Sequence, residues 1–110
     1  MNFQKRFNQK YKINQDTFGV EPLPIVKKTL DYISSGEALD LGVGNGRNTL
    51  YLLSKSFEVT GVDSSQEGIN ILIEKAGNNP KLKTFCTDVL NFETKKQYDL
   101  VLAIGLLHFL

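Results

Sequence analysis

The 110-residue sequence has no tryptophan, one histidine and one cysteine. A single cysteine, Cys86, cannot form a disulfide within the chain, and no Cys/His spacing typical of a metal site is present. We therefore expect a reducing, cytoplasmic setting and no bound metal. No apolar run approaches the roughly 18 residues of a membrane-spanning helix, and the first residues lack the apolar core of a signal peptide. These absences argue against contact with a membrane.

An excess of charge of one sign is also missing, because 13 Lys and Arg residues face 12 Asp and Glu residues. The lysines are dispersed along the chain, so electrostatics gives no reason to expect nucleic acid as a partner. The apolar share of 41% and the charged share of 23% are typical of one globular domain. We expect a single domain over 1–110, with an arm and a leading helix over 1–36 and a core over 37–110.

The periodicity of apolar residues predicts alternating strands and helices. Strands are predicted over 38–41, 57–62, 82–87 and 98–104. Helices are predicted over 23–33, over 47–56, and from a Ser64 or Ser65 cap to the break at 77–80. Strands that alternate with helices favour an α/β fold with a parallel sheet, and right-handed crossovers give the strand order 3-2-1-4.

Three glycines, Gly42, Gly44 and Gly46, follow the first predicted strand, and Asp40 stands two residues before the first of them. Open α/β sheets bind ligands at the carboxyl ends of their strands, where glycine lets a ligand approach the main chain. A dinucleotide site has the spacing G-x-G-x-x-G, whereas Arg47 stands here in place of its third glycine. A carboxylate beside the turn attracts cations and repels phosphates. The pattern therefore predicts a ligand with an ammonium group and no pyrophosphate.

Two further carboxylates, Asp63 and Asp88, end the second and third predicted strands. Asp63, about twenty residues beyond the turn, is placed to accept hydrogen bonds from ribose hydroxyls. Asp88 can accept one from the exocyclic amine of a purine. Taken alone, the glycines are also compatible with a strand-to-helix connection that needs them for its geometry. Carboxylates at three adjacent strand ends would repel one another without a cationic ligand between them, which favours a binding site.

At these residues the sequence resembles the class I S-adenosylmethionine-dependent methyltransferases. The matching segments are 38–48 (ALDLGVGNGRN), 59–65 (VTGVDSS), 85–90 (FCTDVL) and 98–103 (YDLVLA). The segment GNGRNTLYL is most similar to tellurite-resistance methyltransferases. The resemblance covers about 37–110 and only the N-terminal portion of the family's fold. It implies a Rossmann-like three-layer sandwich, truncated relative to seven strands, with S-adenosyl-L-methionine as the cofactor.

The resemblance also implies contacts with that cofactor. Asp40 and the main chain of Gly42 would hold the methionine amino group, with Gly44 and Gly46 packed under the ligand. Asp63 would bind the ribose hydroxyls.

The other implied contacts concern the adenine and the methionine end. Ser64 would lie beside the adenine, Asp88 would accept from its N6 group, and the Val89 amide would meet the ring. Ala103 would line the methionine end. Arg47 either reaches the methionine carboxylate or is a surface residue that opens a helix.

Family members have seven strands, whereas this chain ends soon after its fourth. An unpaired fourth strand would present an open sheet edge, which folded proteins usually cover. We therefore expect either a fragment of a longer gene product or self-association through that edge. Near the two ends of the chain, Tyr11 and His108 are interpreted as packing residues, with the alternatives that Tyr11 folds over the ligand and that His108 acts as a base.

The expected function is S-adenosylmethionine-dependent methyl transfer to a small acceptor, tellurite-like or another small molecule, or the cofactor-binding part of such an enzyme. Displacement at a sulfonium needs mainly a well-positioned nucleophile and the exclusion of water, so the sequence assigns no catalytic residue. The alternative is a non-catalytic module that binds S-adenosylmethionine or another protein. Arg47 argues against a nicotinamide-dependent dehydrogenase.

Overall fold

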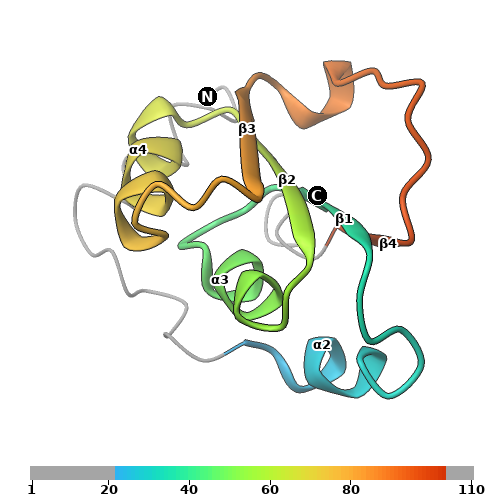
Figure 1. The fold of residues 1–110 in the computed structure, drawn as a ribbon. Helices are drawn as coiled ribbons and strands as arrows, with labels where there is room; N and C mark the ends of the chain where they lie inside the picture. The colour runs from blue at the N-terminus through green and yellow to red at the C-terminus, as the bar shows by residue number, and fades with distance from the viewer. Residues whose placement is uncertain (1–21, 104–110) are drawn as a thin grey trace.

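A computed structural model describes residues 22–103, in which a four-stranded parallel sheet forms the centre (Figure 1). The strands are β1 (Glu37–Leu41), β2 (Glu58–Asp63), β3 (Leu82–Cys86) and β4 (Leu100–Leu102). Their order is β3-β2-β1-β4, which confirms the predicted order. Tyr11 and His108 lie outside the described residues, so the predictions for them stay predictions.

The register of β1 against β2 decides where the strand ends lie. Pairing runs from Glu37 opposite Glu58 to Leu41 opposite Val62, and all four strands point the same way. Asp63, the last residue of β2, therefore lies at the same end of the sheet as the glycine-rich turn that follows β1. Parallel pairing thus brings segments that are far apart in the sequence together at the carboxyl end of the sheet.

The fourth strand is shorter than the predicted 98–104, since only Leu100–Leu102 pair with β1 as a strand. Asp99 still donates its N–H to the carbonyl oxygen of Glu37 over 2.8 Å, which anchors the strand's entrance. Its outer edge has no paired strand in the sheet order of the described residues. Self-association through this edge remains a prediction.

Within residues 22–103, three α-helices accompany the strands: α2 (Pro24–Thr29), α3 (Arg47–Ser54) and α4 (Gln66–Lys75). The first is shorter than the predicted 23–33, because the chain tightens after Thr29 into turns with hydrogen bonds three residues apart, such as Tyr32 N–H to Thr29 O. The predicted cap of α4 is confirmed, since Ser65 Oγ accepts from Gly68 N–H at 3.0 Å.

Side chains from the helices bury one face of the sheet. Ala38 and Val59 of the sheet pack with Val26 of α2 and with Leu52 of α3, and Phe57 is fully buried among them. The helix α4 adds a second cluster of Val43, Ile69 and Leu72. This face holds α3 and α4 beneath the glycine-rich turn and beneath the end of β2.

The opposite face carries the connection between β3 and β4 rather than an α-helix, within the described part of the chain (Figure 1). This connection includes a single 3-10 turn, η1 (Val89–Asn91), whose Val89 packs on Leu39 and Val62. Two apolar residues of this face stay largely exposed, Phe85 at 49% and Val101 at 54%. An open cavity of about 700 Å³ lies here, lined by Leu39, Leu41, Val89, Phe92, Glu93, Thr94 and Lys95.

Gly36, directly before β1, shows why glycine is needed at the entrance of the sheet. Its φ is +130°, and a Cβ at this position would overlap the Asp99 carboxylate. That carboxylate accepts a hydrogen bond from Glu37 N–H at 2.9 Å, so the close approach is part of the contact between β1 and β4.

We expect Gly36→Ala to lower the free energy of unfolding by about 2 kcal/mol or more, through backbone strain and displacement of Asp99. Gly77→Ala is the matched control, because Gly77 also has a positive φ, +63°, but a Cβ added there would have no neighbour within 4 Å. Its cost is expected to be about 1 kcal/mol. Urea denaturation of both variants checks the difference, and equal costs would contradict the role of Asp99.

Candidate functional site

The turn that follows β1 has positive φ values at its three glycines. Gly42, Gly44 and Gly46 have φ values of +80°, +62° and +84°, in the region that favours glycine. Gly42 N–H donates to Val62 O over 2.7 Å, and Gly46 N–H donates to Val43 O over 3.0 Å. The turn is therefore fixed both to β2 and to itself.

The third glycine has a packing role within the protein. A Cβ on Gly46 would lie 2.8 Å from Leu72 Cδ1, so the absence of a side chain lets the start of α3 approach α4. This contact explains Gly46 without a ligand. Its predicted place under a cofactor stays a prediction.

Asp40 lies inside the protein just before this turn, with 2% of its surface exposed. The Thr49 hydroxyl of α3 donates to Asp40 Oδ2 at 2.7 Å. Burial raises the pKa of Asp40 to about 7; the Thr49 hydrogen bond lowers it and the nearby charge of Asp63 raises it. The protein thus keeps a carboxylate at the turn whose charge is costly unless a cation or donor compensates it.

Asp63 is equally buried and connects two turns. Its Oδ2 accepts from Gly44 N–H at 3.3 Å, and its Oδ1 accepts from Ser65 N–H at 2.9 Å. Burial raises the pKa of Asp63 to about 6, while main-chain amides, that of Ser65 foremost, lower it. The Asp63 carboxylate is therefore oriented by main-chain amides of both turns.

Ser64 has a buried hydroxyl at this end of the sheet. The residue is 5% exposed, and its hydroxyl oxygen has no hydrogen-bond partner among residues 22–103. A buried hydroxyl without a partner is costly, and in native proteins such a group calls for a specific explanation. Its position, next to Asp63, fits a hydrogen bond to a ligand.

Asp88 and Val89 reach the same edge but play different parts. Thr87 N–H donates to Asp63 O at 2.9 Å, so the segment after β3 lies beside the end of β2. Asp88 is exposed and caps η1, where its Oδ1 accepts from Leu90 N–H at 2.9 Å. The structure therefore brings Asp40 and Asp63 together in the interior, and leaves Asp88 at the surface in the next turn.

Arg47 and Ala103 complete the predicted set. Arg47 is half-buried at the first position of α3, where its N–H donates to Asn45 Oδ1 at 3.1 Å. Ala103 is exposed and follows β4, whose last residue Leu102 lies opposite Asp40. Both thus flank the turn from neighbouring elements.

Two polar residues of α3 that the sequence analysis missed also hold the site. Thr49 binds Asp40, and Asn48 Oδ1 accepts from Leu23 N–H at 3.1 Å, which fastens the start of α2 to the turn. Both are buried on a helix face that apolar periodicity assigns to the core. The one signal in the sequence was the presence of two polar residues, Asn48 and Thr49, in the first turn of the helix that follows the glycines, and it does not identify their partners.

Among residues 22–103, no group of three or more His, Cys, Asp or Glu side chains is arranged to hold a metal ion. None of the helices in the same range combines the length and the apolar character that a membrane span requires.

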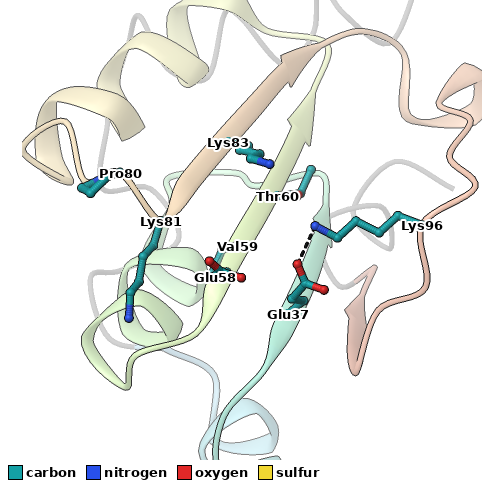
Figure 2. A pocket seen from close by; sticks show the side chains of 8 residues that line it. All are labelled: Glu37, Glu58, Val59, Thr60, Pro80, Lys81, Lys83 and Lys96. Carbon is teal, nitrogen blue, oxygen red and sulfur yellow. Dashed lines mark ion pairs between the residues drawn. The ribbon is translucent and has the colours of Figure 1, made fainter.

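A pocket at the opposite end of the sheet, between Glu37, Glu58 and the lysines Lys81, Lys83 and Lys96, has a volume of only about 40 Å³ (Figure 2). It is far smaller than pockets that hold organic ligands.

Comparison with known proteins assigns the family. A family model described as "Tellurite resistance protein TehB" matches residues 2–110. The chain belongs to the TehB family. Probable S-adenosyl-L-methionine-dependent methyltransferase TehB of Haemophilus influenzae is 34% identical over 79 residues, which are 71% of this chain and 28% of that protein. Ubiquinone biosynthesis O-methyltransferase of Rickettsia bellii is 32% identical over 80 residues, 72% of this chain and 33% of that protein.

Solved structures show the same fold. N-methyltransferase NodS from Bradyrhizobium japonicum WM9, in complex with S-adenosyl-L-homocysteine, has a TM-score of 0.73 at 18% identity over 92% of this chain and 55% of its own. A methyltransferase from Thiobacillus denitrificans, also with S-adenosyl-L-homocysteine, has a TM-score of 0.70 at 21% identity over 96% of this chain and 45% of its own. The TehB-family chain therefore has the methyltransferase fold and spans about half of these structures, but only 28% and 33% of the two curated relatives above.

The raised pKa of Asp40 predicts how stability of the TehB-family chain changes with pH. Between about pH 4 and pH 7 the folded chain keeps a proton that the unfolded chain has lost, so Asp40 makes the fold less stable as pH rises through this window. Asp40→Asn removes the effect. The free energy of unfolding of the variant minus that of the natural chain is therefore expected to rise with pH, by up to about 1.4 kcal/mol per pH unit.

Urea denaturation at pH 5, 6, 7 and 8 measures this difference. Glu74→Gln, which removes an exposed carboxylate from α4, is the control and is expected to give a nearly flat difference. A flat difference for Asp40→Asn as well would contradict the buried, ionisable state of Asp40.

Proposed function

We propose that this chain binds S-adenosyl-L-methionine at the carboxyl edge of β1, β2 and β3, as the cofactor-binding part of a methyltransferase that acts on a small acceptor. The observation that carries the proposal is the pair of buried carboxylates, Asp40 and Asp63, that flank the turn with positive φ values. Membership of the TehB family and the methyltransferase fold support it.

The methionine end of the cofactor fits the turn itself. Asp40 and the main chain of Gly42 would hold the amino group, since a cation offsets the cost of a buried carboxylate. Gly44 and Gly46 would lie under the ligand, and Arg47 would reach the methionine carboxylate. Each of these assignments rests on the family resemblance together with the position of the residue at the turn.

The nucleoside end fits the residues that follow β2 and β3. Asp63 would accept from the ribose hydroxyls, and the hydroxyl of Ser64, which has no partner among residues 22–103, would bond to the bound nucleoside. Asp88 and the Val89 amide would meet the adenine. Ala103, by contrast, would line the methionine end of the cofactor. The exposed carboxylate of Asp88 remains accessible for such a contact.

The chemistry follows from the cofactor, which supplies a methyl group on a positively charged sulfur. The residues of this chain would bind and orient it and exclude water from one side. The relatives named above are connected with tellurite resistance and with ubiquinone biosynthesis, and the proposed acceptor is a small molecule, with a tellurite-like oxyanion as the first to test.

Calorimetry with S-adenosylhomocysteine tests the proposal on the full chain. We expect binding, and we expect Asp63→Asn to raise the Kd about tenfold or more, because hydrogen bonds to a charged group contribute about 1.5–3 kcal/mol. Glu74→Gln is the control and should leave the Kd unchanged. Binding of NAD in place of S-adenosylhomocysteine would contradict the proposal.

The acceptor is tested separately. We expect tellurite, when added to the chain with S-adenosylmethionine, to cause release of S-adenosylhomocysteine.

A further inference from the structure

The Thr49 hydroxyl makes an unusual bond for a threonine in a helix. Threonine hydroxyls on helices commonly donate to the carbonyl oxygen one turn earlier. Thr29 of α2 does so, because its Oγ1 donates to Ile25 O at 2.8 Å. Thr49 of α3 instead donates across the turn to Asp40 Oδ2 at 2.7 Å, and its side chain is completely buried.

We propose that Thr49 is a positioning residue for the cofactor site: by holding Oδ2 of Asp40, it fixes the orientation in which this carboxylate meets the cationic end of the ligand. The inference rests on the proposed function, because it needs Asp40 to bind the amino group. It adds a residue of α3 that does not itself have to touch the ligand.

The electrostatics around Asp40 support this role. Burial and the charge of Asp63 on the neighbouring strand β2 both raise the pKa of Asp40, whereas the Thr49 hydrogen bond lowers it. Asp63 is itself held by the amides of Gly44 and Ser65, so it cannot turn away to relieve the repulsion. Among residues 22–103, Thr49 is thus a neighbour that favours the ionised carboxylate, the form that attracts an ammonium group.

A positioning role and a merely structural role predict different results. If the hydroxyl only satisfied a buried polar group, its removal would change stability and leave the pH dependence of binding unchanged. If the hydroxyl orients Asp40 for contact with a cation, its removal weakens the binding of S-adenosylhomocysteine and raises the pH at which binding appears. Both effects should vanish when position 40 no longer carries an ionisable group.

The experiment measures the Kd of S-adenosylhomocysteine by calorimetry from pH 6 to pH 9 on the full chain. Thr49→Val is expected to raise the Kd at pH 7.5 about tenfold and to move the pH midpoint of binding upward by about one unit. Thr49→Ser, which keeps the hydroxyl, should stay within about threefold of the natural chain. Thr29→Val, the same change on α2, is the matched control and should leave both quantities unchanged. In an Asp40→Asn background, Thr49→Val should change the Kd by less than about twofold.

The outcomes separate this inference from the proposed function. If the natural chain does not bind S-adenosylhomocysteine at any pH, the proposed function fails and this inference fails with it. If the natural chain binds and Thr49→Val binds equally tightly with the same midpoint, the role of Thr49 is overturned and the proposed function stands.

A measurement without ligand covers a variant that folds poorly. The pKa of Asp40, followed by carboxyl-carbon NMR, should be higher in Thr49→Val, or in the smaller Thr49→Ala if valine disrupts the fold, and unchanged in Thr49→Ser. An Asp40 pKa that is the same in all of these variants would overturn the inference.

Discussion

The parallel pairing of β1 with β2 places Asp40 and the end of β2 at the same edge of the sheet, where Asp40 and Asp63 both lie out of contact with water. Two buried carboxylates near each other are expensive, because each loses its hydration and each repels the other. The chain offsets part of this cost with a hydroxyl from α3 and with main-chain amides of the two adjoining turns. The conformation of those turns is thus tied to the two charges, and in the turn after β1 one of the amides belongs to Gly44, which has a positive φ.

This arrangement explains why the site is built from elements that pack on one face of the sheet. Helices α3 and α4 begin at the two turns, and Leu72 of α4 closes on Gly46 at the start of α3. A Cβ at position 46 would displace the Cδ1 end of Leu72, and the φ of +84° would be strained for a residue with a side chain. The start of α3 and its packing on α4 therefore both depend on glycine at this position.

Much of this fold is readable from the sequence because its signals are local. Short apolar runs that end at Gly42, Asp63 and Asp88 mark strands, and crossover handedness then leaves few strand orders. The predicted length of α2 was wrong, because the apolar spacing continues to Ile33 while the backbone tightens into shorter turns after Thr29. Sequence periodicity reports which residues are buried, and it does not distinguish an α-helix from the tighter turns that continue it.

The site is less completely readable. Asp40 and Asp63 could be named because each lies at or near the end of a predicted strand, yet the exposure of Asp88 depends on the 3-10 turn that it caps. The contact of Thr49 with Asp40 bridges a turn between two elements, and no spacing rule within one helix or strand describes it. Such contacts become visible only when the turn has its full three-dimensional course.

The two ends of the sheet differ in how exposed their charged groups are to the solvent. At the start of the strands, Glu37 and Glu58 are paired side by side, and Lys96 forms an ion pair with Glu37 at the surface (Figure 2). Dissolved ions screen exposed charges of this kind over about 10 Å at 0.1 M, whereas they reach buried carboxylates far less. Ionic strength therefore acts more strongly on the exposed charges at the start of the strands than on the buried carboxylates at their carboxyl ends, so added salt perturbs one end of the sheet in preference to the other.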